Sequence, residues 1–152
     1  MKFVGKLSSF FEADVNTLIG QLITSMQQEY ASDKQAHWEK MATVLNLIIT
    51  ASISCYTYSH GATEVRIGSD LLESYIQQLV VPELQLQPNV PLDNLPILKS
   101  TCIKFVYMFR NQIPDNYVGE FVNLFSDYLK SESRVIQSYS AACIEKLLIK
   151  KS

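Results

Sequence analysis

Apolar residues recur along most of this 152-residue chain at steps of one, three or four positions, the spacing of one face of an α-helix. The clearest case lies between residues 117 and 129, where the pattern indicates an amphipathic helix and not a strand. Its apolar members are Tyr117, Val118, Phe121, Val122, Phe125, Tyr128 and Leu129. The same periodicity predicts six main helices, which pair into hairpins.

The first predicted helix covers residues 15–30, with Asp14 as its N-cap, because an aspartate side chain can bond the free N–H groups of a first turn. A polar break at residues 31–34 separates it from a second helix that ends near Ile53. Trp38 is predicted to be a core residue of this first hairpin. The apolar stripe of the first helix is Val15, Leu18, Ile19, Leu22, Ile23, Met26 and Tyr30.

Between residues 54 and 69 the periodicity fades, and we predict a loop. Asp70, with Glu73 three residues later, resembles a capping box that opens a third helix. Pro82 should end or kink this helix, because proline removes a backbone donor and clashes with the preceding turn. Residues 85–95 are predicted to be a connection and not a domain linker, since their length is that of an ordinary long loop.

A fourth helix is predicted to begin at Pro96, a residue that suits a first turn. The hexapeptide 109–114 should stop it. Arg110 complements the helix dipole, Asn111 tolerates the left-handed conformation of a helix end, and Pro114 prevents continuation. The apolar stripe of this helix is Ile97, Leu98, Cys102, Phe105, Val106 and Phe109.

A fifth helix follows residues 114–116, and a polar break at residues 131–133 precedes the sixth. Counted from Gln35, Ile97 and Ser133, the second helices of the three pairs begin 62 and 36 residues apart. A unit of roughly 40 residues with two helices has the size of a HEAT-type repeat, so we predict an all-α fold, an α-solenoid. Periodicity alone leaves a simple six-helix bundle open.

The predicted organisation is a single segment, residues 1–152, with repeats at 14–53, 70–110 and 115–149. Residues 1–12 form the tail of a truncated repeat, because they carry an apolar helical stripe without a partner helix. That stripe is Phe3, Val4, Leu7, Phe10 and Phe11. Neither end has the polar capping repeat of a finished solenoid, so we expect a piece of a longer chain.

Composition narrows the class of protein. The net charge is -2 without a long run of one sign, which gives no electrostatic footprint for nucleic acid or anionic lipid. The start lacks the apolar region of a signal peptide and no uncharged apolar run approaches 18 residues, so we expect no membrane insertion. Three widely spaced cysteines, Cys55, Cys102 and Cys143, indicate reduced, buried thiols in a cytosolic or nuclear protein.

Candidate chemistry is sparse, and we predict no catalytic, cofactor-binding or metal-binding residues. His37 and Glu39 have the spacing of zinc deaminases, but the Pro-Cys-x-x-Cys partner is missing from the sequence. His60 is most simply a solvated loop residue. Gly61 and Gly68 are not followed by the Gly-Lys-Ser/Thr that would hold a phosphate. An enzyme is therefore the least supported class.

Surface candidates are a second group. Tyr56, Tyr58 and Tyr107 fit the helix stripes less well than the other aromatic residues, and aromatic residues often mark interfaces. Three lysines near the end of the chain should serve the helix dipole and solubility, although they could touch an acidic partner. They are Lys146, Lys150 and Lys151.

Several segments, taken in order, resemble one family: residues 10–12, 28–31 with the Trp38 hairpin, 81–84, 98–114 and 138–148. The most specific is the hexapeptide Phe-Arg-Asn-Gln-Ile-Pro at 109–114. The family is that of exportin-2, or CAS, the importin-alpha export receptors among the importin-beta-like karyopherins. The similarity covers essentially the whole chain.

The resemblance implies a superhelix of HEAT repeats without enzymatic activity or cofactors. It implies binding of importin-alpha and Ran-GTP through the full-length protein, contact with nuclear pore proteins, and shuttling between nucleus and cytoplasm. The loops at 54–69 and 85–91 diverge, and Ile136 stands where many HEAT units carry arginine. No family motif places a partner contact on a residue of this chain. A HEAT scaffold of another karyopherin, a coat adaptor or a phosphatase scaffold is the alternative.

Overall fold

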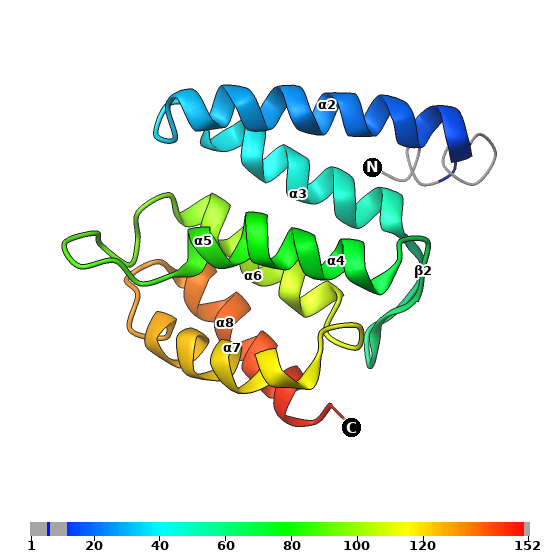
Figure 1. Cartoon of the computed structure of the whole chain (residues 1–152). Helices are drawn as coiled ribbons and strands as arrows, with labels where there is room; N and C mark the ends of the chain where they lie inside the picture. The colour runs from blue at the N-terminus through cyan, green and yellow to red at the C-terminus, as the bar shows by residue number, and fades with distance from the viewer. Residues whose placement is uncertain (1–5, 7–11, 151–152) are drawn as a thin grey trace.

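The computed structural model describes residue 6 and residues 12–150, and it is built mainly from helices (Figure 1). The helical elements are α2 (Glu12–Ser32), α3 (Trp38–Ser52), α4 (Ser69–Tyr75), the π-helical η1 (Ile76–Val80), α5 (Val81–Leu84), α6 (Pro96–Met108), α7 (Asp115–Tyr128) and α8 (Arg134–Leu148). The terminal stripe from Phe3 to Phe11 lies outside the described residues.

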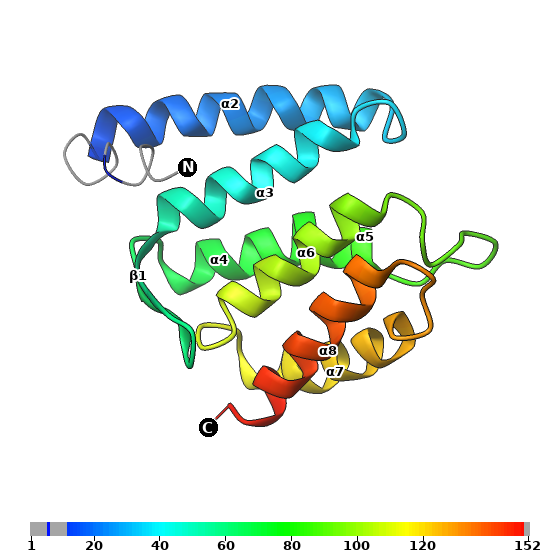
Figure 2. The same cartoon turned by 180° about the vertical axis from the view of Figure 1, so that it is seen from behind.

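In the described residues, α4, η1 and α5 follow one another without a break and count as one helical stretch. The six stretches counted in this way pack in two layers. One layer holds α3, α6 and α8, with α6 packed against both of the others. In the second layer α2 packs on α3, α5 on α6 and α7 on α8. Figures 1 and 2 show this stack from two sides. The predicted α-solenoid of HEAT type is confirmed.

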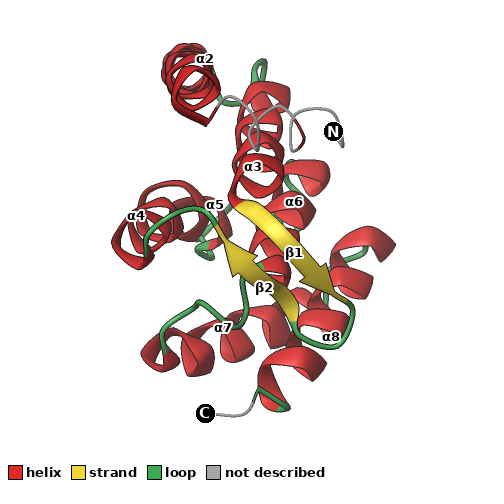
Figure 3. Ribbon diagram, turned by 90° about the vertical axis from the view of Figure 1, so that its right-hand side faces the viewer, coloured by secondary structure: helices red, strands yellow, loops and turns green. Residues whose placement is uncertain are grey.

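A β-hairpin replaces the loop predicted at residues 54–69. Strands β1 (Ile53–Thr57) and β2 (Gly61–Val65) pair antiparallel between α3 and α4. Figure 3 shows the hairpin running from the end of α3 towards α8. The prediction of an unstructured connection was wrong because helical periodicity is blind to short strands, which are marked here by β-branched and aromatic residues.

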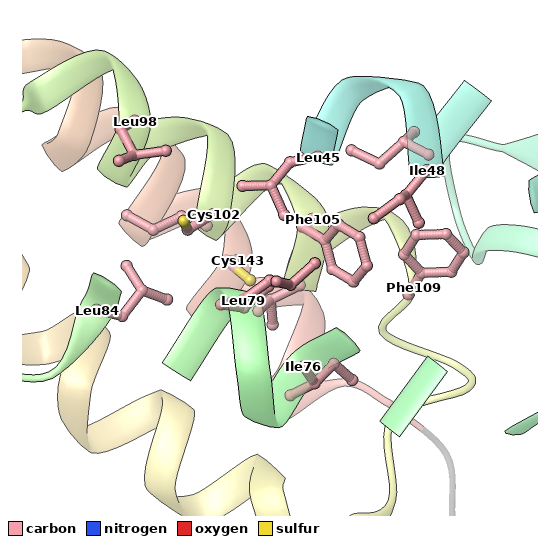
Figure 4. Close-up of a cluster of buried hydrophobic side chains, with 14 of the residues drawn as sticks. Leu45, Ile48, Ile76, Leu79, Leu84, Leu98, Cys102, Phe105, Phe109 and Cys143 are labelled. Carbon is pink, nitrogen blue, oxygen red and sulfur yellow. The ribbon is translucent and has the colours of Figure 1, made fainter. Parts of the chain in front are cut away.

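The core lies between the layers and draws on every pair of helices (Figure 4). Leu45 of α3, Leu79 of η1, Phe105 of α6 and Cys143 of α8 are all buried there. Ile103 of α6 is also fully buried although it lies outside the predicted stripe. The reason is that α6 sits between α3 and α8, so more than one of its faces is covered.

Two cysteines belong to this core. Burial raises the pKa of the Cys102 thiol well above its ordinary value and that of the Cys143 thiol to about 12, despite the opposing charge of Arg110 near Cys143. Both groups therefore stay protonated and pack as small apolar side chains. Cys55 on β1 is exposed, so the prediction that all three thiols are buried was wrong for this residue.

Some residues of the predicted stripes stay exposed, among them residues of the end helix α2 and of the start of α6. Leu18 and Leu22 of α2 are 60% and 42% exposed, whereas Ile23 and Tyr30 are buried. Among the described helices α2 packs chiefly on α3, so only part of its stripe finds a partner. Ile97 in the first turn of α6 is also exposed.

Helix starts follow the sequence signals only in part. Pro96 opens α6 as predicted. Asp14 is not an N-cap, since it lies inside α2. The capping box at Asp70 was also wrong: Gly68 precedes the first turn of α4, and no side-chain cap bond forms at this described helix end. Asp70 instead sits in the first turn, where its charge complements the helix dipole.

Pro82 does not end its helix, contrary to one of the two predicted outcomes. It lies near the start of α5, which continues to Leu84. The preceding turn, η1, widens to π geometry, and the Val81 N–H donates to the Ile76 carbonyl five residues back. Such a π turn is a common way for a helix to absorb a local disruption of its bonding ladder.

Candidate functional site

The hairpin of β1 and β2 is fixed by residues far away in the chain. Tyr56 pairs with Ala62 and Thr57 with Gly61, while the register shifts between Ile53 and Tyr56. At the turn, the His60 N–H donates to the Thr57 hydroxyl at 3.2 Å. A two-stranded hairpin is marginal by itself in water, so its position depends on what holds it.

The hexapeptide holds it. Three consecutive side chains of residues 110–112 each donate to a backbone carbonyl of the hairpin, and the three carbonyls belong to alternate residues. The bonds run from Arg110 Nη2 to Tyr58 O at 2.9 Å, from Asn111 Nδ2 to His60 O at 2.6 Å and from Gln112 Nε2 to Ala62 O at 2.8 Å. The helix stop is therefore also a clamp on the hairpin.

Arg110 is the centre of this clamp. Its side chain is only 2% exposed, its Nη1 donates to the Tyr107 carbonyl at 2.7 Å, and its guanidinium lies 4.6 Å from the centre of the Tyr107 ring. The predicted role at the helix end agrees with the bond to Tyr107, but the burial of Arg110 and its bond to Tyr58 were not predicted. The guanidinium carries its charge inside the protein, bonded to two carbonyls and stacked on an aromatic face.

Asn111 was predicted to adopt the left-handed conformation, and that prediction was also wrong. Among the described non-glycine residues, positive φ occurs at Asn89 and Leu95 instead. The four residues after Met108 form turns, in which the Gln112 N–H bonds the Phe109 carbonyl at 2.8 Å. The chain therefore stops at the predicted place, but through tight turns that aim the Asn111 amide at the hairpin.

Gly61 is required where the clamp meets the hairpin. Its φ is +76°, a conformation that residues with a side chain rarely adopt. A Cβ at this position would lie 2.7 Å from Arg110 Nη1 and 2.7 Å from the Met108 carbonyl oxygen. The role of Gly61 is thus conformational and steric, which fits the absence of any phosphate-binding motif around it.

Beside the clamp, four tyrosines surround an open hollow of about 360 Å³. Tyr56 and Tyr58 come from the hairpin, Tyr107 from α6 and Tyr139 from α8. Tyr58 is 73% exposed and Tyr139 is 37% exposed. The three tyrosines predicted to be surface candidates are thus brought to one place. The fourth was missed, because its spacing on α8 is that of an ordinary core stripe.

Tyr107 is the most enclosed of the four. Burial, reinforced by the neighbouring Tyr56, raises the pKa of its hydroxyl, while the Arg110 charge acts in the opposite direction. The hydroxyl is therefore protonated at neutral pH, and the hollow presents uncharged rings that each carry a polar edge. This arrangement suits binding through apolar contact and hydrogen bonds.

The predicted basic end is engaged with the protein. Lys146 Nζ lies 5.0 Å from the centre of the Tyr58 ring. Lys150 Nζ donates to the Ile113 carbonyl at 2.6 Å and to Asp115 at 2.8 Å. Both side chains are only about one-tenth exposed, 12% and 11%. Lys151 lies outside the described residues.

The candidates for metal chemistry stay apart. His37 lies just before α3, and His60 lies in the hairpin turn, where its Nδ1 is 3.5 Å from the Thr57 hydroxyl. Within residues 12–150, no three His, Cys, Asp or Glu side chains form a group that could hold a metal ion. None of the described helices combines the length and apolar character needed to cross a bilayer.

Comparison with known proteins identifies the family. The Cse1 family model matches residues 1–144. This chain belongs to the Cse1 family. Exportin-2 of Homo sapiens is 28% identical over 141 residues, and exportin-2 of Mus musculus is 30% identical over 141 residues; each match covers 93% of this chain and 14% of that protein. Exportin-2 of Xenopus laevis is 28% identical over 145 residues, 95% of this chain.

The fold agrees with that of a solved family member. The exportin Cse1 in its cargo-free, cytoplasmic state matches with a TM-score of 0.85 over 96% of this chain, at 22% identity. The match covers 15% of that chain, so the residues here span about one-seventh of the length of this solved exportin. The predicted family resemblance is confirmed by the match to the Cse1 family model and by the relatives named exportin-2.

Proposed function

We propose that the protein carrying this chain is a nuclear export receptor that returns importin-alpha from the nucleus to the cytoplasm in a complex with Ran-GTP. The observation that supports this proposal is the match to the Cse1 family model over residues 1–144. The relatives that match over 93% of the chain are named exportin-2. Such a receptor shuttles between the two compartments and passes the pore by contacting nuclear pore proteins.

The chain would contribute scaffold to this receptor. We assign three repeats to residues 14–53, 70–110 and 115–149, each a hairpin of two helical stretches. In support, α2 packs on α3, α5 on α6 and α7 on α8, and the second members α3, α6 and α8 pack in sequence. In a solenoid of this kind, small rotations between repeats add up, so a ligand bound at one part can change the shape elsewhere.

The clamp would stiffen the joint between the first two repeats. The hairpin leaves α3 of the first repeat and is bonded by residues 110–112 at the end of the second. Side-chain bonds to backbone carbonyls hold that connection to one position. If the superhelix of such a receptor changes its pitch, we expect the rotation at this joint to be smaller than at joints without such a connection.

The test is capture of the full-length protein on immobilised importin-alpha. We expect retention when Ran loaded with GTP is present, and a large loss of retention with Ran loaded with GDP. A classical import cargo in place of importin-alpha is the control. Retention of the import cargo but not of importin-alpha, with either nucleotide, would contradict the proposal.

A further inference from the structure

One face of α8, together with the two residues that follow this helix, lines two hollows beside the hairpin. The residues of this face recur at steps of one, three or four positions, the spacing of one side of a helix. They are Ser138, Tyr139, Ala142, Lys146, Ile149 and Lys150. The first three line the tyrosine hollow and the last three line a second hollow of about 510 Å³. Figure 3 shows the hairpin and α8 as neighbours on this side.

The second hollow is basic. Arg110, Lys146 and Lys150 line it together with His60, and no carboxylate lies among its described lining residues. The carboxylates paired with the two lysines, Glu145 and Asp115, are 66% and 69% exposed at the side chain. The Lys146 and Lys150 side chains are themselves only 12% and 11% exposed, so a ligand carboxylate reaches them by displacing these exposed partners.

The two hollows meet where Lys146 lies over Tyr58. Tyr58 belongs to the lining of the tyrosine hollow, Lys146 to that of the basic hollow, and 5.0 Å separates the ammonium nitrogen from the ring centre. We call the combined surface the aromatic–basic groove. Apolar contact is available at one end and positive charge at the other, within a few turns of one helix.

We propose that the aromatic–basic groove binds an extended acidic peptide segment that carries one aromatic side chain. The aromatic ring packs among Tyr56, Tyr107 and Tyr139, where ring edges and faces give favourable contacts. Carboxylates on the adjoining residues pair with Lys146 and Lys150. An aromatic anchor in a hollow, next to charge pairs at its rim, is the usual distribution of binding energy in a protein interface.

Charge decides in favour of a peptide over a nucleic acid. Both ligands offer rings and negative groups, but nucleic-acid binding is steered by a strongly basic surface. This chain carries a net charge of -2, and each groove lysine already has a carboxylate close by. A few carboxylates on a peptide match this limited positive charge better than a continuous phosphate backbone does.

The binding experiment uses fluorescence anisotropy with the intact protein and a short labelled peptide in which glutamates flank one phenylalanine. We expect saturable binding that weakens as salt is raised. Three probes define the chemistry: the same peptide with phenylalanine replaced by alanine, the same peptide with glutamates replaced by glutamines, and a labelled oligouridine. Each should bind at least about tenfold more weakly than the parent peptide.

Variants locate the site. Tyr139→Ala and Lys146→Gln should each weaken peptide binding by about tenfold or more, whereas Lys146→Arg should retain most of it. Matched controls lie outside the groove: Val135→Ala on the same helix, 51% exposed, and Lys130→Gln, whose side chain is 73% exposed. The controls should bind like the unaltered protein, and circular dichroism checks that each variant is folded.

Four results would overturn the proposal: no saturable binding of the acidic peptide, equal binding of the glutamine peptide, tighter binding of oligouridine, or losses in the controls equal to those in the groove variants. The readout does not involve importin-alpha or Ran. Failure of the export proposal would therefore leave this result intact, and the reverse also holds.

Discussion

The two long connections of the chain were both predicted to be loops, yet the structure fixes them in different ways. Residues 53–68, between α3 and α4, form the β-hairpin. Residues 85–95, between α5 and α6, have no regular secondary structure. The hairpin is held by residues 110–112, which follow α6. The connection at residues 85–95 instead holds residues 131–133, which precede α8.

The hairpin is an acceptor of hydrogen bonds. Its carbonyls receive N–H groups from residues 110–112, one of them from the buried guanidinium of Arg110. The acceptors are neutral backbone carbonyls, which carry no charge that acid could remove. This anchor should therefore be insensitive to the protonation of carboxylates.

In the second connection, residues 85–95, the acceptor is a side chain and not the backbone. Asp93 accepts hydrogen bonds from the Ser131 hydroxyl, from the Glu132 N–H at 3.2 Å and from the Ser133 N–H at 3.1 Å. These groups lie in the turn just before α8, so the Asp93 carboxylate fixes the residues that lead into the helix. Lys99 supports the loop by donating to the Pro91 and Leu92 carbonyls.

The comparison teaches that a connection without a recognisable local motif can still be strongly specified. A long-range donor or acceptor replaces the missing local signal in both cases. The two anchors differ in their acceptors, since one uses neutral backbone carbonyls and the other a carboxylate. The five predictions below use this difference.

Arg110→Ala should have the largest effect, lowering the free energy of unfolding by about 3 kcal/mol, because two carbonyls lose a charged donor inside the protein. Urea titration measures the loss, and hydrogen exchange should show faster exchange of hairpin amides. Arg110→Lys should retain only part of the stability that Arg110→Ala loses, since lysine lacks the planar fork of the guanidinium. A loss below about 1 kcal/mol would mean that Arg110 acts only on the helix dipole.

Gly61→Ala should lower the free energy of unfolding by about 2 kcal/mol, since alanine is strained at positive φ and its Cβ would contact the clamp. Gly119→Ala is the matched control. It lies within α7, with open space around its Cβ position, and should raise stability by up to about 1 kcal/mol. Thermal melts that shift in the same direction for both variants would contradict the steric role of Gly61.

Asp93→Ala should lower the free energy of unfolding by about 1 to 2 kcal/mol, because a hydroxyl and two N–H groups lose a charged acceptor. The effect should be confined to the loop and the first turn of α8, which hydrogen exchange can resolve from the hairpin. Asp93→Asn should cost less, because an amide oxygen still accepts a hydrogen bond. Equal exchange rates in α8 for all three proteins would show that the contact does not support the helix.

Acid should weaken the anchor of the connection at residues 85–95, which depends on the Asp93 carboxylate, and not the anchor of the hairpin. The hydrogen bond from Ser131 lowers the pKa of Asp93 below its ordinary value, against the effect of burial; the Ser133 and Glu132 N–H groups and the Lys99 charge also lower it. Its contribution is therefore complete above the unfolded pKa of about 3.9 and is lost as pH falls through the lower folded pKa. Denaturation at neutral pH and at about pH 3 should show a smaller gap between the unaltered protein and Asp93→Asn in acid. An unchanged gap would contradict this assignment.

Asn111→Ala should have the smallest effect, under about 1 kcal/mol, because Asn111 is exposed and water can replace its amide at the His60 carbonyl. Gln112→Ala, at a half-buried position, should cost more than Asn111→Ala. Urea titration of the pair provides the order. The reverse order would mean that the exposed bond from Asn111 to His60 contributes more stability than the half-buried bond from Gln112 to Ala62.

Much of the fold was predictable because helix signals are local. The stripe at residues 117–129 and the stop before Pro114 depend on residues a few positions apart, and both describe the structure correctly. The candidate site was predicted only in part. Tyr56, Tyr58 and Tyr107 were selected as surface residues, but nothing in their spacing indicated that they share one hollow with Tyr139.

The sequence by itself determined the helices, their breaks, the solenoid class and the family of this protein, because amphipathic periodicity and an ordered set of motifs can be read along the chain. Only the tertiary structure decided the conformation of the two connections and the burial of Arg110. The three clamp bonds join residues 50 to 52 positions apart, and the Asp93 bond to Ser131 spans 38. Contacts over such separations depend on how helices stack, which local patterns do not specify.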